Sequence, residues 1–198
     1  YALAAGRNAE ALAFANEVPA NAGSEFRYAT ADLSPLWSVF TGLRYFSAQA
    51  SLVTQAESGD TRVTAQFGTT PQSSFGGSSI VPVLRFATQT EPVAMFTQDE
   101  LALIRAEALA RLNRVEEART AVNGVRTRAG LAARTATELG TQQAVLDEVL
   151  RQRRYSLFAT GTAWADLRRF GRITQARVTW LPYPLNERSG NPNTPPNP

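Results

Sequence analysis

The sequence predicts an all-α fold of stacked helix pairs, with minor β segments and an irregular, proline-rich C-terminal tail. Apolar residues recur at intervals of three and four over most of the chain, which is the period of an amphipathic helix. Two alanine-rich stretches, 1–18 and 97–129, repeat the same order of helix, short turn and helix. Proline is concentrated in 181–198, which holds six of them. We therefore expect a single helical domain over 1–198, with an extended tail at 186–198.

The stretch 97–129 is the clearest helix pair. Thr97 followed by Glu100 is a capping box, in which the two residues satisfy backbone N–H groups at the start of a helix. Gly130 suits the helix C-terminus, because glycine tolerates the left-handed conformation. Small side chains dominate both inner faces, so the two helices can pack closely as an αα-hairpin. The apolar positions expected to face inward are Leu101, Ile104, Ala108 and Leu112 on the first helix and Ala118, Ala121, Val122 and Val125 on the second.

The stretch 1–18 follows the same logic, and Pro19 ends its second helix. Two units related in this way fit tetratricopeptide-like pairs, the kind of unit from which helical repeats are stacked. Ser34 as N-cap and Pro35 at the first helical position open another helix, which the apolar spacing extends to about Val53.

Between the helix pairs the pattern is mixed. Residues 61–67 alternate like a short strand, and Asp60 before them is expected to be a turn residue that pairs with Arg62. Residues 68–82 are rich in Gly, Ser and Thr and are expected to form a flexible loop. Two further segments are expected to be extended and to pair as a small hairpin, namely 81–87 and 93–96.

Two helices are expected after the central pair. Thr141 caps a long helix that runs to about Thr160. Gly161 then breaks the pattern, and a short helix follows over 163–170. Trp164 on that short helix, and Leu167 one turn later, are expected to be buried.

The composition excludes most catalytic machinery. The chain has no His, no Cys and no Lys, so all 20 basic residues are Arg. The commonest general base, the usual nitrogen and sulfur metal ligands, and the lysines of Schiff bases and P-loops are therefore missing. The formal net charge of +3 is weak evidence for a nucleic-acid partner. We expect a protein that is not an enzyme, with no cofactor, metal or nucleic acid.

No run of 18 or more apolar residues occurs, so no transmembrane helix is expected. The chain begins at Tyr1 inside a helical pattern, and we expect the natural start to lie upstream, with room for a signal peptide or lipid-modified cysteine. Membrane association would then depend on that anchor or on a partner protein.

Four residues are candidates for ligand binding. Three of them lie in the predicted helix that starts at Ser34, namely Trp37, Arg44 and Tyr45. Aromatic faces suit the C–H surface of a pyranose, and arginine donors suit its hydroxyls. Aromatic residues at helical spacing more often form a core, so that alternative stays open. Phe75 is an isolated aromatic in the loop 68–82, where it either contacts a ligand or partner or anchors the loop.

Arginine is concentrated near the end of the long helix and just after it. An anion site is one interpretation, because guanidinium groups offer a planar fork of donors. We favour a bracing role beside Glu107, Asp147, Glu148 and Asp166, because no stacking platform or glycine cradle accompanies the cations. The arginines concerned are Arg151, Arg153, Arg154, Arg168, Arg169 and Arg172.

Five segments follow one another in a distinctive order: LALIRAEALARL, then EEARTAVNGVRTRAGL at 116–131, VLDEVLRQRRYSLFATGTAWADLRRFGR at 145–172, LPYP at 181–184 and NPN at 191–193. In order and spacing they resemble the C-terminal part of the SusD/RagB-like family. The resemblance covers most of 97–193 and, more faintly, 1–67. This chain keeps the family's Asp166, Leu167 and Arg168. It has Gln152, Ser156, Thr160 and Thr162 where the family commonly has Glu, Glu, Glu and His or Tyr.

The resemblance implies a secreted, lipid-anchored protein on the extracellular face of the outer membrane. Such a protein binds an oligosaccharide or similar nutrient without catalysis and is partnered with a TonB-dependent transporter. The chain would be less than half of a full family member. The alternative is a helical scaffold docked on a larger envelope or membrane assembly, with no sugar binding. A concave surface bearing exposed aromatic side chains would favour the first function.

Overall fold

The computed structural model divides the chain into two compact units, Tyr1–Phe158 and Ala159–Pro198. Most elements are helices, but the first unit also contains two small antiparallel sheets. The expectation of an all-α fold with minor β segments therefore holds only in its coarser form, as a mainly helical chain. The structure describes residues 1–19, 21–73, 77–176, 179–180 and 183–195.

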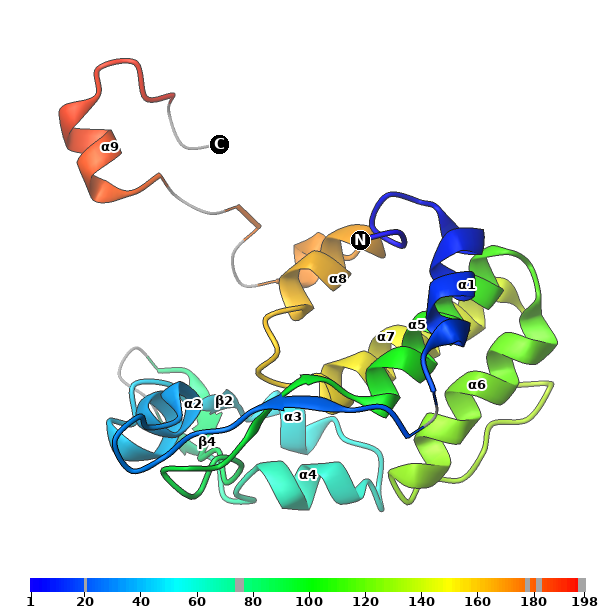
Figure 1. Cartoon of the computed structure of the whole chain (residues 1–198), viewed down its shortest axis with the longest axis horizontal. Coiled ribbons are helices and arrows are strands. Elements are labelled where there is room, and N and C mark those ends of the chain that lie inside the picture. The colour runs from blue at the N-terminus through cyan, green and yellow to red at the C-terminus, as the bar shows by residue number, and fades with distance from the viewer. Residues whose placement is uncertain (20, 74–76, 177–178, 181–182, 196–198) are drawn as a thin grey trace. The chain divides into compact units, whose positions relative to one another are not determined.

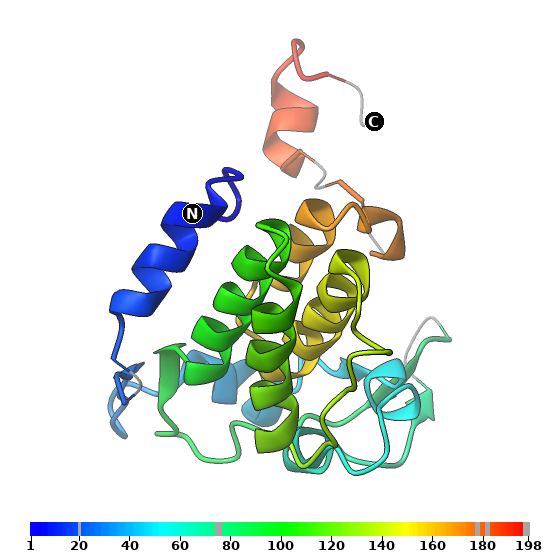
Figure 2. The same cartoon turned by 90° about the vertical axis from the view of Figure 1, so that its right-hand side faces the viewer.

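Four helices form the centre of the first unit. α5 packs against the other three, and Figures 1 and 2 show α1 on one side of it with α6 and α7 beside it. Because α5 has neighbours around most of its surface, its burial extends beyond the predicted stripe to residues such as Leu103 and Ala106, while Leu112 at its end is exposed. The four helices are α1 (Asn8–Glu17), α5 (Gln98–Arg111), α6 (Val115–Arg128) and α7 (Gln142–Ser156).

The helix pair predicted over 97–129 is confirmed as α5 and α6. The Thr97 hydroxyl accepts a hydrogen bond from the backbone N–H of Glu100 at 3.1 Å, which caps α5. Asn113 takes a positive φ of 60° in the turn, and Gly130 takes φ 79° just after α6. The matching pair predicted over 1–18 contains a single helix, α1, preceded by one turn. Tetratricopeptide-like repetition is therefore not confirmed.

The helix predicted from Ser34 to Val53 is wrong in its second half. Ser34 and Pro35 do start α2 (Pro35–Trp37), which continues into the π-helical segment η1 (Ser38–Gly42). The helix ends at Gly42, and Arg44 in the turn that follows takes a left-handed conformation. The chain then forms β2 (Ala48–Gln49) and a short helix, α3 (Ser51–Thr54).

The strand predicted over 61–67 is also wrong, because these residues form α4 (Thr61–Gln66). Asp60 is its N-cap: the carboxylate accepts a hydrogen bond from the backbone N–H of Arg62 at 3.0 Å. Val63 and Gln66 are buried three residues apart on one face of α4, and Phe67 just after the helix is buried in an extended conformation. In so short a segment the same apolar residues fit alternation as well as helical spacing, and the cap decides between them.

The hairpin predicted from 81–87 and 93–96 has the wrong partners. β5 (Val93–Phe96) pairs antiparallel with β1 (Ser24–Phe26), more than sixty positions earlier. β4 (Ser79–Val81) lies in the middle of the other sheet, between β2 and β3 (Gln72–Ser73). Both β3 and β4 fall within the range for which the sequence predicts a loop.

The second unit holds α8 (Ala163–Arg169), the 3-10 turn η2 (Ile173–Gln175) and α9 (Leu185–Gly190). The tail was expected to be extended throughout 186–198, and α9 corrects this. Pro184 stands at the N-cap of α9 and Pro192 follows it, so prolines flank the helix and none interrupts it.

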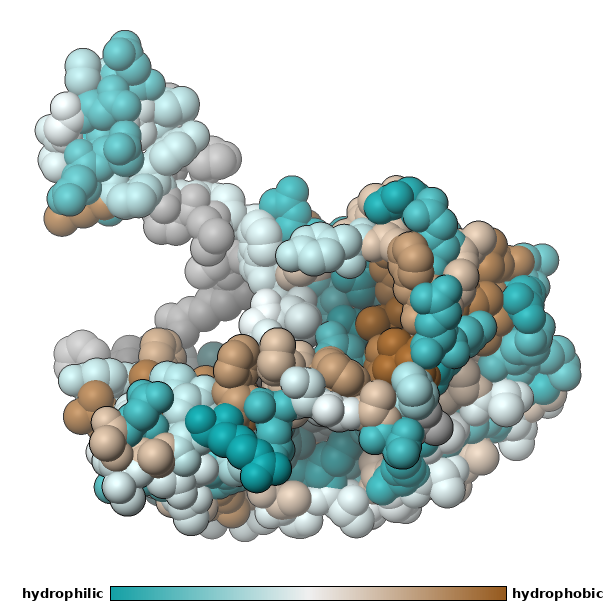
Figure 3. Space-filling view, viewed as in Figure 1, coloured by the Kyte–Doolittle hydropathy of each residue, from teal (hydrophilic) through white to brown (hydrophobic). Residues whose placement is uncertain are grey.

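Exposed apolar side chains occur in several places on the first unit. In the space-filling view of Figure 3 they gather beside α1 and α5 and along the band of β1 and β5. Phe14, Phe26 and Met95 are among them. Exposure of an aromatic side chain alone therefore does not identify a site. Within the described parts of the chain, no helix combines the length and apolar character needed to cross a bilayer.

Candidate functional site

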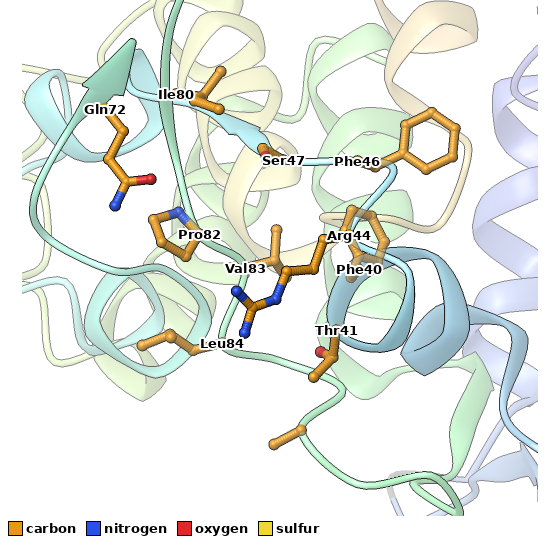
Figure 4. Close-up of a pocket in the computed structure, with 11 residues that line it drawn as sticks. Phe40, Thr41, Arg44, Phe46, Ser47, Gln72, Ile80, Pro82, Val83 and Leu84 are labelled. Atoms are coloured by element: carbon orange, nitrogen blue, oxygen red, sulfur yellow. The ribbon is translucent and has the colours of Figure 1, made fainter. Parts of the chain in front are cut away.

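A pocket of about 370 Å³ opens beside η1 in the first unit. Residues of η1 and the turn after it form one wall, the segment that follows β4 forms the other, and Gln72 projects from β3 at the edge (Figure 4). Most lining side chains are apolar, and Arg44 is the charged one among those that the structure describes. The lining residues are Phe40, Thr41, Arg44, Phe46, Ser47, Gln72, Ile80, Pro82, Val83, Leu84 and Ala87.

The aromatic wall is anchored in the core of the unit. The ring of Phe40 stacks on Phe86 with 5.8 Å between centroids and lies 6.0 Å from Phe158. Phe158 in turn meets buried Phe67 edge-on at 4.7 Å. Each such pair contributes roughly 0.5–1.5 kcal/mol beyond its buried area. The ring of Phe46 lies 6.2 Å from that of Phe40, so it extends the cluster to an exposed residue of the pocket lining.

Two strained residues shape the walls. Arg44 has φ 54° and Phe86 has φ 66°, the left-handed region that costs a residue with a side chain roughly 1–2 kcal/mol. The Thr41 hydroxyl donates to the carbonyl oxygen of Phe86 at 2.9 Å and so ties one wall to the other. With this backbone, the guanidinium of Arg44 is directed across the pocket toward Val83 and Leu84 (Figure 4).

A second guanidinium belongs to Arg85, next to the lining residue Leu84. It lies 5.0 Å from the ring centroid of Phe86 and makes long hydrogen bonds of 3.5 Å to the Gln66 side chain and the Phe158 carbonyl oxygen. Burial lowers the pKa of Arg85 from its usual value, while the negative charge of Glu91 opposes that change.

The structure separates the sequence candidates for ligand binding. Arg44 lines the pocket, whereas Trp37 and Tyr45 do not. The indole of Trp37 packs on Gly42, where an added Cβ would lie 3.0 Å from the ring. Tyr45 is 72% exposed, and Phe75 lies outside the described residues.

Sequence reasoning did not single out Phe40 and Phe46 as pocket residues. The signal for Phe40 was its position four residues before Arg44, which places both on one helical face. Phe46 carried no such signal, because its place depends on where the helix ends. The facing segment after β4 could not be identified from local pattern, since it reaches the pocket through sheet pairing.

In another part of the first unit, outside the pocket, polar side chains connect the helices through hydrogen bonds. Arg62 donates to Asp60 and Gln152 at 2.7 Å each and to the Ser156 hydroxyl at 2.8 Å. That hydroxyl donates to Asp99 at 2.8 Å. Gln152 and Ser156 connect α4, α7 and α5 in this way, since an amide and a hydroxyl can accept hydrogen bonds as a carboxylate does.

Arg126 is the centre of the buried part of this network, with its side chain 1% exposed. It donates to Glu148 at 2.6 Å and to both carboxylate oxygens of Glu57 at 2.7 and 2.9 Å. Burial alone would lower the pKa of Arg126, but the hydrogen bonds to these carboxylates outweigh burial and raise it. The hydrogen bond from Arg126 lowers the pKa of Glu57. Gln152 donates to Glu148 at 2.7 Å and joins the two parts of the network.

The exposed arginines of α7 also make local contacts. Arg151 lies 3.8 Å from Glu148, and Arg154 donates to Gln55 and Ser51. These contacts favour the bracing interpretation of the arginine-rich stretch over an anion site.

In α8, the buried carboxylate of Asp166 pairs with Arg169 at 2.8 Å, and the guanidinium of Arg168 lies 4.8 Å from the Trp164 ring centroid. Trp164 and Leu167 were expected to be buried, and both are only half-buried. Asp166, which lies between them in sequence, is the buried residue of this helix instead.

Comparison with known proteins identifies one family. The sequence model described as the SusD family matches residues 90–197. No curated protein is similar enough to this chain to count as a match.

Solved structures of SusD superfamily proteins are similar to the chain. One is a SusD superfamily protein from Parabacteroides distasonis, with 20% identity over 73% of this chain and 38% of that one, at a TM-score of 0.54. Another is a SusD superfamily protein from Bacteroides thetaiotaomicron, with 25% identity over 49% of this chain and 22% of that one, at a TM-score of 0.42. The chain therefore spans well under two thirds of the length of either protein.

Proposed function

We propose that this chain, which belongs to the SusD family, takes part in binding an oligosaccharide or similar nutrient at the outer-membrane surface. The observation that carries the proposal is the pocket beside η1, with its aromatic wall and a few polar groups. The pocket lies outside residues 90–197, where the family match is found. The support for a binding role of the pocket therefore comes from its shape and its lining side chains.

The lining suits a sugar ring. A pyranose presents apolar C–H faces that pack on aromatic or aliphatic side chains, and hydroxyls at its edge that need hydrogen-bond partners. Phe46 and Phe40 offer the first kind of surface, and Arg44 with Gln72 offers the second. About 370 Å³ is near the lower end of small-molecule pockets, which are roughly 300–1,000 Å³. Tyr45, next in sequence to Arg44, remains a candidate contact at the rim.

The test is saccharide binding by the purified chain, first on a glycan array and then by calorimetry with the glycans it retains. Phe46→Ala should weaken binding about 5- to 30-fold, because a half-buried aromatic contact is worth roughly 1–2 kcal/mol. Phe14→Ala is the matched control: Phe14 is 57% exposed and Phe46 60%, and Phe14 does not line the pocket. Equal loss in both variants, or no loss in either, would contradict the assignment of the pocket.

We further propose delivery of the ligand to a TonB-dependent transporter, with an anchor or partner holding the protein at the extracellular face. A pull-down from detergent-solubilised envelopes tests this proposal. Recovery of a TonB-dependent barrel supports it. Recovery of a different envelope complex, together with an array that retains no glycan, would instead support the scaffold alternative.

We also propose that the chain binds without catalysis, since it lacks histidine, cysteine and lysine. In the described parts of the chain, no group of acidic side chains is arranged to hold a metal ion. Turnover of a retained glycan by purified protein would contradict this proposal.

A further inference from the structure

We propose that the pocket selects saccharides that carry negative charge, with Arg44 as the residue that binds a uronate carboxylate. This inference rests on the proposed function and adds the class of sugar. It depends on the charge balance of the pocket and on the backbone conformation at Arg44.

The guanidinium of Arg44 is unpaired within the part of the chain that the structure describes. Among the residues that the structure describes, it makes no ion pair and no hydrogen bond. Most arginines of the first unit do have a carboxylate, including Arg62, Arg126 and Arg134, which pair at 2.6–3.1 Å. Arg44 is thus a cation that the fold leaves available.

The surroundings of Arg44 do not compensate its charge. The described lining contains no aspartate or glutamate, and its other polar side chains are Thr41, Ser47 and Gln72, which are neutral. Arg85 adds positive charge behind the wall, and the acidic group close enough to affect it is Glu91, which does not line the pocket. Apolar walls also strengthen the field of a cation, because they exclude water from part of its surroundings.

The backbone supports the same assignment. Arg44 occupies a left-handed position at which glycine would be unstrained, yet the residue is an arginine whose side chain crosses the pocket. A strained backbone at a residue whose charged group makes no ion pair or hydrogen bond in the described chain points to a contact with a ligand.

A uronate is the anion that fits best. The planar fork of a guanidinium matches a carboxylate through two parallel hydrogen bonds. The aromatic wall formed by Phe40 and Phe46 then receives the apolar face of the same ring. A pocket of about 370 Å³ has room for roughly one or two sugar rings, so one carboxylate is enough to set the preference.

The experiment compares charged and uncharged forms of the same sugars by calorimetry. The probes are trisaccharides of galacturonate, glucuronate and mannuronate, each with its methyl ester, in which the carboxylate charge is removed. We expect at least one acid to bind tenfold or more tightly than its ester in low salt, with the difference shrinking in 0.5 M NaCl. Arg44→Gln should abolish the difference. Arg27→Gln is the control, because Arg27 is exposed and lies outside the lining.

The outcomes separate this inference from the function on which it rests. If acids and esters bind equally and Phe46→Ala weakens both, the charge preference is wrong and the saccharide pocket stands. A preference for acids that survives Arg44→Gln would overturn the role of Arg44. A trisaccharide without uronates that carries a sulfate ester and binds more tightly than every uronate would overturn the carboxylate assignment. Failure of every saccharide to bind would overturn both proposals.

Discussion

Replacing Arg126 with methionine should destabilise the first unit strongly. Methionine is long enough to occupy much of the same space but cannot pair with Glu57 or Glu148. The Glu148 side chain is 8% exposed, so its charge would remain buried, with Gln152 as its hydrogen-bond donor and the 56% exposed Arg151 as a distant cation at 3.8 Å. Glu57 is more exposed and keeps its contact with Arg134 at 3.1 Å, so it contributes less to the loss.

The magnitude follows from the cost of an unpaired buried charge. Removing one partner of a buried ion pair costs roughly 3–5 kcal/mol. At about 2–4 °C per kcal/mol for a chain of this size, the expected fall in Tm is roughly 6–20 °C. Adding Glu148→Gln to Arg126→Met removes the buried charge and keeps an oxygen that can accept from Gln152. The double variant should therefore regain at least about 1 kcal/mol.

The assay is urea unfolding at pH 7, followed by far-UV circular dichroism. Arg114→Met is the matched control, because Arg114 pairs with Glu117 at 2.6 Å but is 48% exposed. An exposed pair contributes at most about 1 kcal/mol, so this variant should unfold close to wild type. If Arg126→Met lost no more stability than Arg114→Met, the buried network would not be the brace that we infer.

Two further predictions concern acid stability and backbone strain. The pKa of Glu57 is lowered by its hydrogen bond from Arg126, and that of Glu138 falls to about 2, chiefly through the backbone N–H of Thr135 and then the side chain of Arg134. Both values lie below the ordinary 4.5, so this stabilisation is complete above about pH 5 and is lost as the pH falls toward 2. The urea concentration at the midpoint of unfolding should fall between pH 7 and 2.5, and Glu138→Gln should make that fall smaller. A midpoint that does not change with pH would contradict the lowered pKa values. Arg44→Gly should leave Tm unchanged or raise stability by up to about 1 kcal/mol, because glycine relieves the left-handed strain. A clear fall in Tm measured by calorimetry would mean that the Arg44 side chain stabilises the fold.

Local sequence was reliable where a cap and a period agreed. Thr97 and Thr141 both cap helices, as the sequence predicts, although the burial of α5 extends beyond its predicted apolar stripe. Such signals act within a few residues, so they do not depend on the rest of the fold.

Local sequence failed where distant contacts decide the outcome. The strand partner of β5 is β1, far earlier in the chain, and no turn signal connects them. The helix that starts at Pro35 ends at Gly42, although the apolar spacing of the sequence continues beyond it. The residues that follow form β2, which pairs with β4. Tertiary pairing outweighs propensity in such short elements.

The sequence by itself determined the mainly helical character, the central α5–α6 pair, the absence of the usual catalytic side chains, and Arg44 as a ligand candidate. Only the tertiary structure decided which groups accompany Arg44. It placed Phe40 and Phe46 on one wall of the pocket and residues after β4 on the other. The indole of Trp37 packs on Gly42 and does not line the pocket. The physical reason is range. Caps, periods and composition are properties of neighbouring residues, whereas a pocket forms from segments that meet only after the sheet and the aromatic core have assembled.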